Sequence, residues 1–215
     1  LNKFLKRLKK NGSKFSYRKV QNKSRKVYEA NITIFDALKK SDTDLNGRFY
    51  LERYIAAHAI MISFEGIPAI YFNSLFGKSN DEAKYVITGN NRDVNRYKWN
   101  YKNISKKLGD KTSKQSIFFQ NLGKLLSIKR KQKAFHPNGK RLNINLGSKI
   151  FCFERLSLDR KQSIICITNL SSTNQNAKLD RSLINYKDLM SPKTKLIEKN
   201  ILALKPFQTV WLANN

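Results

Sequence analysis

The chain has few acidic residues, and it contains no long apolar run. Its 215 residues include 43 Lys and Arg but only 15 Asp and Glu, so the net charge is +28 at pH 7. No segment approaches the ~18 consecutive apolar residues of a membrane helix, since the longest candidate, 55–64, is interrupted by His58 and Ser63. No apolar segment follows the basic N-terminus as it would in a secretory signal. We therefore expect neither a membrane span nor a secreted protein.

Cysteine is also scarce. Cys152 and Cys166 lie within apolar runs typical of strands, and they lack the partners and spacing of a zinc site. We interpret them as two buried thiols of a protein in the reducing cytoplasm rather than as a disulfide. The sequence thus predicts no metal site.

The positive charge favours anionic partners, and nucleic acid is the first to consider. However, the lysines are spread along every segment, and no RNA-recognition motif, zinc finger or clear helix-turn-helix accompanies them. We interpret the charge mainly as a drift of composition. Nonspecific, salt-sensitive binding to polyanions is still expected, and a basic nucleic-acid-binding module is kept as an alternative function.

The chain is 40% hydrophobic and 11% aromatic, which is enough for a packed core. Periodic apolar residues predict three helices, at 1–10, at about 48–64 with Gly66 as the C-terminal cap, and at about 113–135 with Ser113 as the N-cap. A short buried strand is predicted at 69–72, and residues 74–108 are predicted to be mostly loop. A further strand is expected at 15–17.

The sequence changes character after Pro137. Short runs rich in β-branched and aromatic residues, separated by turn signals, predict strands at 142–146, 150–156, 163–169, 195–198 and 208–213. The expected fold class is therefore α/β plus all-β, with a small β-sandwich or β-meander at the end. The chain is too short for a complete (β/α)8 barrel, which takes ~250 residues, but it could contain the last section of one.

The most informative stretch is Gly66–Arg96. A Gly66-Ile67-Pro68 turn leads into the apolar run at 69–72, and a long polar segment then ends in Arg92 and Arg96. A buried strand that opens into a long polar loop is how a (β/α) barrel builds its active face. The segment is longer than the ~4–6 residues that a simple connection needs.

Six ordered motifs resemble one known family. They read FSYRK at 15–19, YEANITIFDAL at 28–38, AAHAIMISFEGIPAIYFNSLFGKSND at 56–81, TGNNRDVNR at 88–96, KAFHPNG at 133–139 and LALKPFQTVWL at 202–212. In this order they are similar to the C-terminal portion of sucrose-phosphorylase-type enzymes of the α-amylase superfamily, a group that includes glucosylglycerate phosphorylases. The resemblance covers nearly the whole chain.

The resemblance implies a domain division. Residues 1–40 would form an inserted subdomain with the acceptor-site loop, and residues 41–136 would form the end of a (β/α)8 barrel, with strand 8 at 69–72 between helices 7 and 8. Residues 137–215 would form the C-terminal β domain. The chain would be cut from something longer, so the missing N-terminal half of the barrel is an expected partner.

The resemblance also implies a chemistry. Such enzymes are retaining and need a carboxylate nucleophile and a carboxylic acid/base ~5–5.5 Å apart. Inorganic phosphate is the co-substrate, α-glucose 1-phosphate is the product, and no other cofactor is implied. In the family the nucleophile, the acid/base and a transition-state-stabilising aspartate lie on earlier barrel strands, and that aspartate stands in a His-Asp motif that this sequence lacks. We therefore expect no catalytic residue in this chain and no activity of the chain alone.

The residues implied to bind substrate come from two motifs. Arg92 matches the family arginine that contacts the donor glucose, and Arg96 would support the loop; a surface ion pair is the alternative for each. Tyr28 and Glu29 match the loop that lines the acceptor subsite, and Asn31 would hold that loop's shape. Sucrose phosphorylases often carry Gln where this chain has Glu29, so Glu29 favours the glucosylglycerate type. The alternative interpretation of Tyr28 and Glu29 is that they are ordinary loop residues.

Other conspicuous side chains are expected to be structural. We interpret His58 as a packed, hydrogen-bonded histidine and His136, before Pro137 at the domain boundary, as structural; Tyr71, Phe72 and Trp211 are expected to be core residues. The acceptor stays open between fructose, glycerate, glycerol and other compounds. An inactive remnant of such an enzyme stays a further alternative.

Overall fold

The computed structural model describes residues 2–19, 25–192 and 197–214. Within them the chain divides into two compact units. The first unit comprises residues 1–48 and 70–120, and the second comprises residues 49–69 and 121–215. The division into 1–40, 41–136 and 137–215 follows family motifs rather than contacts, and it stays a prediction.

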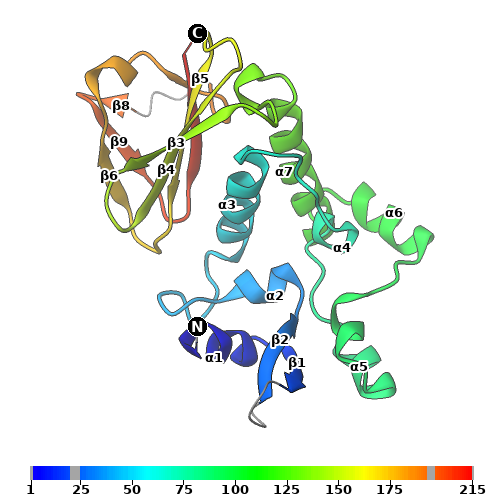
Figure 1. Cartoon of the computed structure of the whole chain (residues 1–215). Helices are drawn as coiled ribbons and strands as arrows, with labels where there is room; N and C mark the ends of the chain where they lie inside the picture. The colour runs from blue at the N-terminus through cyan, green and yellow to red at the C-terminus, as the bar shows by residue number, and fades with distance from the viewer. Residues whose placement is uncertain (1, 20–24, 193–196, 215) are drawn as a thin grey trace. The chain divides into compact units, whose positions relative to one another are not determined.

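The first unit is mostly helical, with one two-stranded antiparallel sheet (Figure 1). Its elements are α1 (Asn2–Lys10), β1 (Lys14–Lys19), β2 (Arg25–Asn31), α2 (Ile34–Lys39), α4 (Phe72–Leu75), α5 (Glu82–Thr88), the 3-10 helix η1 (Asn91–Asn95), α6 (Tyr101–Gly109) and the first part of α7 (Lys114–Lys129). Buried aromatic rings hold it together. Phe35 meets Phe118 edge to face at 5.7 Å, and Phe76 stacks on Phe119 at 5.7 Å.

The short helices of this unit depend on side-chain caps rather than on wide apolar faces. Asp81 accepts the Lys84 N–H at 3.2 Å before α5, and Asn100 accepts the Asn103 N–H at 3.2 Å before α6. Each cap satisfies one of the N–H groups that a helix start leaves without a partner. Gly89 then closes α5 in the left-handed conformation, at φ 65°.

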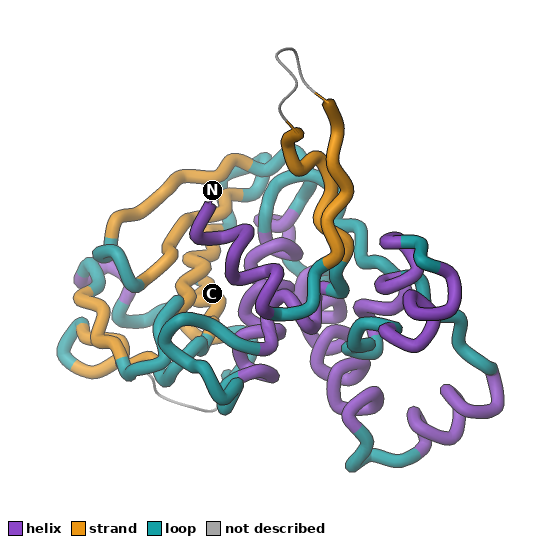
Figure 2. The backbone as a smooth tube through the Cα atoms, turned by 90° about the horizontal axis from the view of Figure 1, so that it is seen from below, coloured by secondary structure: helices purple, strands orange, loops and turns teal. Residues whose placement is uncertain are grey.

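The second unit combines helices with two antiparallel sheets. Its elements are α3 (Tyr50–Ser63), the rest of α7, the 3-10 helices η2 (Lys133–Phe135) and η3 (Arg181–Leu183), and the strands β3 (Lys140–Asn145), β4 (Ile150–Leu156), β5 (Ser163–Asn169), β6 (Gln175–Lys178), β7 (Lys187–Asp188), β8 (Ile197–Glu198), β9 (Ile201–Leu204) and β10 (Thr209–Ala213). The strand order is β3-β4-β5-β10-β7 in one sheet and β6-β9-β8 in the other. Figure 2 shows these strands in orange.

One buried apolar cluster joins the two sheets of this unit. It takes Cys152, Ile165, Ile167, Val210 and Leu212 from the larger sheet, and Ala177, Ile197, Leu202 and Leu204 from the smaller one. Alternate residues of β9 are buried and exposed, as a strand with one face in a core requires. The opposite face of the larger sheet is also covered, because Trp211 is fully buried and meets Phe135 edge to face at 4.8 Å.

A fully buried arginine lies on that opposite face. Arg155 donates from Nη1 to the Ser63 carbonyl at 2.5 Å, and from Nη2 to the His136 and Gly139 carbonyls at 2.7 and 3.3 Å. Ser63 is the last residue of α3, so the guanidinium satisfies a carbonyl at the negative end of that helix. Arg155 therefore ties the helix end to the segment that enters the β region.

Several sequence predictions are confirmed. The strands at 150–156 and 163–169 have the predicted bounds, and α1 ends directly before Asn11-Gly12. The Ser113 hydroxyl accepts the Ser116 N–H at 3.1 Å, as an N-cap of α7 would. Both cysteines are free and buried, and Trp211 belongs to the core.

The predicted strand at 69–72 is wrong. Residues 67–71 have no regular secondary structure and pair with no strand among the described residues, and Phe72 already begins α4. The prediction that Tyr71 and Phe72 are core residues is also wrong, because their exposed fractions are 56% and 55%. An apolar run becomes a buried strand only where neighbours pair with its backbone and cover its side chains.

Other boundaries also need correction. Residues 74–108 are not mostly loop but hold α5, η1 and α6, whose signal is capping rather than periodicity. The helix from Ser113 ends at Lys129 instead of Phe135, and α3 ends at Ser63, three residues before the predicted cap Gly66. Strands β6, β7 and β9 were not predicted, and Lys195 of the predicted strand 195–198 lies outside the described residues. No helix in the described ranges has the length and apolar character needed to cross a bilayer.

Candidate functional site

A β-bulge in the hairpin β1–β2 exposes Tyr28. Ser16 lies opposite Glu29, but the next residue of β1, Tyr17, lies opposite Val27, so Tyr28 has no partner on β1. An extra residue of this kind bends the strand and redirects its side chain, and bulges are common beside functional sites. Tyr28 is 55% exposed.

Arg92 and Glu29 form an ion pair although 63 residues separate them in the sequence. The Arg92 Nε lies 3.1 Å from Glu29 Oε1 and 3.2 Å from Oε2. The hydrogen bond and the charge of Glu29 raise the pKa of Arg92 above its usual value, with smaller contributions from Tyr28. The structure therefore brings three predicted site residues together: Tyr28, Glu29 and Arg92.

This ion pair is accessible to solvent. About half of the Arg92 side chain and a third of the Glu29 side chain are exposed. Exposed pairs of this kind contribute little to stability, because water screens both charges and two long side chains must be ordered. A ligand that offers hydroxyl or carboxylate groups could therefore replace one partner at small energetic cost.

Two asparagines fix the backbone that carries the pair. Asn31 is buried, and its Nδ2 donates to the Lys14 carbonyl at 3.4 Å and to Ser16 Oγ at 3.3 Å. Asn91 Nδ2 donates to the Phe15 carbonyl at 3.1 Å and to the same Ser16 Oγ at 3.3 Å. Asn31 thus holds the hairpin, and Asn91 docks η1 on it. Asn91 was not among the residues predicted from the sequence, although it stands directly before Arg92.

Arg96 does not join this cluster. It follows η1, its side chain is exposed, and its N–H donates to the Asp93 carbonyl at 3.4 Å. The Asp93 pKa is lowered first by a hydrogen bond from Lys84, and the charge of Arg96 is among the lesser causes. Arg96 thus lies at the end of η1, and the nearby Asp93 already forms an ion pair with Lys84.

Further asparagines, also missed from the sequence, connect the rest of the loop. Asn80 Oδ1 accepts the Thr33 N–H at 2.9 Å, and Asn80 Nδ2 donates to the Gly12 carbonyl at 3.3 Å. Asn73 Nδ2 donates to the Tyr97 carbonyl at 3.1 Å, and Asn73 Oδ1 accepts the Trp99 Nε1–H at 2.8 Å. Asparagine serves this purpose because its amide both donates and accepts.

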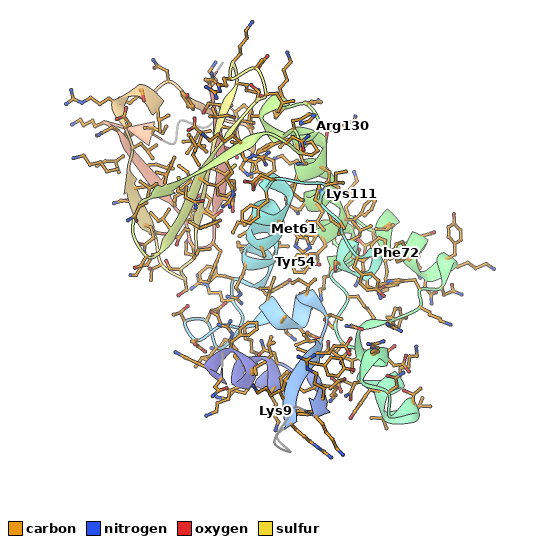
Figure 3. The ribbon with its side chains drawn as sticks, viewed as in Figure 1. Lys9, Tyr54, Met61, Phe72, Lys111 and Arg130 are labelled. Atoms are coloured by element: carbon orange, nitrogen blue, oxygen red, sulfur yellow. The ribbon has the colours of Figure 1, made fainter. Side chains whose placement is uncertain are left out.

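A hollow of about 220 Å³ lies beside this network. Ile32, Thr33, Ile34, Tyr71, Asn73, Ser74, Lys78 and Asn95 line it. Larger hollows of about 480 and 820 Å³ lie on the second unit, but none of the predicted site residues lines them. Figure 3 labels Phe72, the first residue of α4, which directly follows the lining residue Tyr71 in the sequence.

Each acidic side chain of the first unit already has a structural partner. Glu29, Asp42, Glu82 and Asp93 are paired with Arg or Lys, whereas Asp36, Asp44, Asp81 and Asp110 accept backbone N–H groups. Across the described ranges, no group of three or more His, Cys, Asp or Glu could hold a metal ion. The arrangement therefore offers hydrogen bonds to a polar ligand but no pair of free carboxylates for bond cleavage.

The two histidines lie in the second unit. His58 is buried, its Nδ1 lies 2.9 Å from the Tyr54 carbonyl, and burial lowers its pKa. Figure 3 shows Tyr54 on the same helix. The His136 Nδ1 accepts the Asn138 N–H at 3.1 Å, and its carbonyl accepts from Arg155. His58 is a packed, hydrogen-bonded histidine, as predicted, and His136 is an exposed residue with hydrogen bonds at the start of the β region.

No protein-family model matches the chain. It is 30% identical over 206 residues to the glucosylglycerate phosphorylase of Escherichia coli, which covers 95% of this chain and 35% of the relative. The glucosylglycerate phosphorylase of Spirochaeta thermophila is 27% identical and covers 86% of this chain and 33% of the relative. The sucrose phosphorylase of Agrobacterium vitis is 30% identical over 51% of this chain. The chain thus spans about a third of the length of the glucosylglycerate phosphorylases it matches.

Two solved structures share the fold of most of this chain. The sucrose 6F-phosphate phosphorylase from Thermoanaerobacter thermosaccharolyticum matches with a TM-score of 0.62 at 22% identity, over 79% of this chain and 31% of that one. A maltotriose complex of AmyP matches with a TM-score of 0.62 at 16% identity, over 77% of this chain and 35% of that one. At these identities the likeness shows a shared fold of mixed helices and sheets.

Proposed function

Since the chain is homologous to the C-terminal portion of the glucosylglycerate and sucrose phosphorylases, we propose that it is part of a retaining α-glucosyl-transferring phosphorylase. The enzyme would cleave sucrose or a related α-glucoside with inorganic phosphate and release α-glucose 1-phosphate. The observation that carries the proposal is the meeting of Arg92 with Tyr28 and Glu29, because the resemblance assigns these residues to the two sides of one substrate site.

Arg92 would bind hydroxyl groups of the glucose ring. Its guanidinium has five N–H donors in a rigid fork, and both hydrogen bonds to Glu29 come from Nε. Glu29 and Tyr28 would contact the acceptor, with Glu29 accepting hydrogen bonds from its hydroxyls. Glu29 at this position favours the glucosylglycerate type. Arg96 would support the loop, and Asn31 would hold the hairpin.

The groups that break the glycosidic bond would lie outside this chain. A retaining enzyme needs two carboxyl groups ~5–5.5 Å apart, and the acids of the first unit are occupied as described. Residues 67–71 have no strand partners among the described residues, and the missing part of the barrel would lie beside them. The second unit would then supply the β-sandwich-like domain that follows the barrel.

A chimeric enzyme tests this proposal. The 215 residues would replace the homologous portion of the Escherichia coli glucosylglycerate phosphorylase, and release of α-glucose 1-phosphate from glucosylglycerate and from sucrose would be followed. We expect an active chimera and no activity from the 215 residues alone. Arg92→Ala should lower kcat/KM about a hundredfold, which corresponds to roughly 3 kcal/mol of charged hydrogen bonding. Arg96→Ala is the matched control and should change it less than fivefold.

Two outcomes would contradict the proposal. Phosphorolysis at normal rates by the isolated chain would show that its own residues carry out the chemistry. Equal losses for the Arg92 and Arg96 variants of an active chimera would remove the sugar-binding role of Arg92. If the chimera does not fold, alanine at the aligned arginine of the intact relative provides the same comparison.

A further inference from the structure

A group of exposed cations without acidic partners lies on α1 and on the outer ends of β1 and β2. We call it the basic surface, and it consists of Lys6, Lys9, Lys10, Arg18, Lys19, Arg25 and Lys26. In the described part of the chain, no ion pair joins any of the seven to an Asp or Glu, whereas their neighbours Lys3 and Lys14 pair with Asp42 and Glu82. Helix α1 and the hairpin lie side by side in Figures 1 and 2, and Figure 3 labels Lys9 on that helix.

The hairpin places like charges directly opposite each other. Arg18 lies opposite Lys26, and Lys19 lies opposite Arg25, in one antiparallel register. Like charges at facing positions of adjacent strands destabilise a sheet. A phosphate group between each pair would turn this repulsion into attraction, so the arrangement is complementary to a polyanion rather than to a neutral or cationic partner.

Exposed aromatic rings lie among these cations. Phe4 of α1 is 49% exposed and Tyr17 of β1 is 54% exposed. Proteins that bind single strands combine a positive surface that follows the phosphates with aromatic side chains on which bases stack. The rings therefore favour a single strand over a duplex, whose bases are stacked on one another.

A membrane surface fits less well. An amphipathic helix that binds lipid must bury its apolar side in the bilayer. In α1 that side packs within the first unit, since Leu8 is only 6% exposed and Leu5 is partly buried. Phe4 is then the exposed large apolar residue of this helix.

We propose that the basic surface binds single-stranded nucleic acid, with its cations neutralising phosphates and with Phe4 and Tyr17 stacking on bases. This activity is separate from the sugar site, whose arginine lies in η1 and is paired with Glu29. Recognition is through the backbone, so it is independent of base sequence.

The salt dependence of the binding constant provides a quantitative test. Single-strand binding weakens with a log–log slope of about −0.7 for each phosphate neutralised, so seven cations predict a slope of about −5. The probe is a fluorescein-labelled oligo(dT), titrated by anisotropy with the full 215-residue chain at several salt concentrations. We expect tighter binding to oligo(dT) than to a duplex of equal length or to phosphatidylserine vesicles.

Matched variants locate the surface. The hairpin variant combines Arg18→Gln, Lys19→Gln, Arg25→Gln and Lys26→Gln, and should bind roughly a hundredfold more weakly at 0.1 M salt, with a slope of about −2. The control combines four exposed lysines of the second unit, Lys149→Gln, Lys161→Gln, Lys178→Gln and Lys187→Gln, and should keep the parent slope. Because like charges are removed, the hairpin variant should melt no lower than the parent.

Equal losses in the two variants would overturn the proposal, because binding would then follow net charge alone. Preference for the duplex or for the vesicles would also overturn it, as would an unchanged slope in the hairpin variant. If the hairpin variant loses its circular dichroism, the helix variant Lys6→Gln, Lys9→Gln, Lys10→Gln gives an independent answer, with an expected slope of about −3.

Discussion

Replacing the buried Arg155 with Met should destabilise the second unit by about 3 kcal/mol. The change removes three hydrogen bonds from a cation to the carbonyls of Ser63, His136 and Gly139. Each such bond contributes about 1.5–3 kcal/mol, and the carbonyls would be left buried without donors. The total is smaller than the sum because Met relieves the burial of a charge whose Nε has no hydrogen-bond partner among the described residues.

Urea unfolding followed by tryptophan fluorescence measures this effect. Trp211 is fully buried in the second unit, whereas Trp99 belongs to the first, so a Trp99→Phe background isolates the signal of the second unit. In that background Arg155→Met should lower the unfolding free energy by about 3 kcal/mol and the thermal midpoint by roughly 10 °C. Arg155→Lys is the control. It should lose less unfolding free energy than Arg155→Met, because lysine keeps the charge and can reach one of the carbonyls.

An Arg155→Met variant whose unfolding free energy lies within about 0.5 kcal/mol of the parent's would refute this reasoning. It would mean that the cost of burying the guanidinium cancels the hydrogen bonds it makes, as happens for some buried ion pairs. A loss of stability seen only in the Trp99 signal of a chain that keeps both tryptophans would equally contradict it, because the hydrogen-bond partners of Arg155 among the described residues all lie in the second unit.

Two further predictions concern single residues. Gly77→Ala should destabilise the first unit by about 2 kcal/mol, because its φ is +55° and a Cβ would lie 2.7 Å from the Phe118 ring. Gly89→Ala, with φ +65° and no neighbour within 4 Å, should cost only the ~1 kcal/mol of backbone strain. Urea unfolding followed by Trp99 fluorescence, in a chain that keeps this tryptophan, measures both changes. Burial lowers the pKa of His58 below its usual value of 6.5, so as the pH falls below that value the unfolded chain binds the proton first and the second unit loses stability. His58→Gln should remove this part of the pH dependence in urea titrations between pH 7 and 5. An unchanged pH dependence would contradict the prediction.

The sequence predicted well the elements whose signals are local. The strands at 150–156 and 163–169 are short, apolar and bounded by turns, and the helix that begins after Ser113 carries its own cap. Residues 69–72 failed because a strand depends on partners elsewhere, and an apolar composition cannot supply them. Helices α5 and α6 were missed because Asp81 and Asn100 cap them without an apolar repeat.

The site shows the same limit. Tyr28, Glu29 and Arg92 were each predicted from motifs, but the ion pair between residues 63 positions apart was not. Nothing in the local sequence marks Asn73 or Asn80 as network residues, since asparagine is common in loops. Arg155 was also missed, because arginine in a strand is normally expected to face solvent.

The two cysteines lie on opposite faces of the larger sheet. Cys152 is opposite Ile167 and Cys166 is opposite Phe153, so the thiols are one register step apart and point into different layers. Cys152 belongs to the cluster between the sheets, whereas Cys166 does not and is instead influenced by Ser63, Arg155 and Lys129. Burial raises the pKa of both thiols, that of Cys152 to about 12.

Each thiol can therefore react with an alkylating reagent only when its own layer opens. The chain thus carries two native probes of local unfolding in one sheet, read separately by mass spectrometry without any substitution. Which thiol is modified first in mild denaturant reports whether the space between the sheets or the layer beneath the helices loosens first.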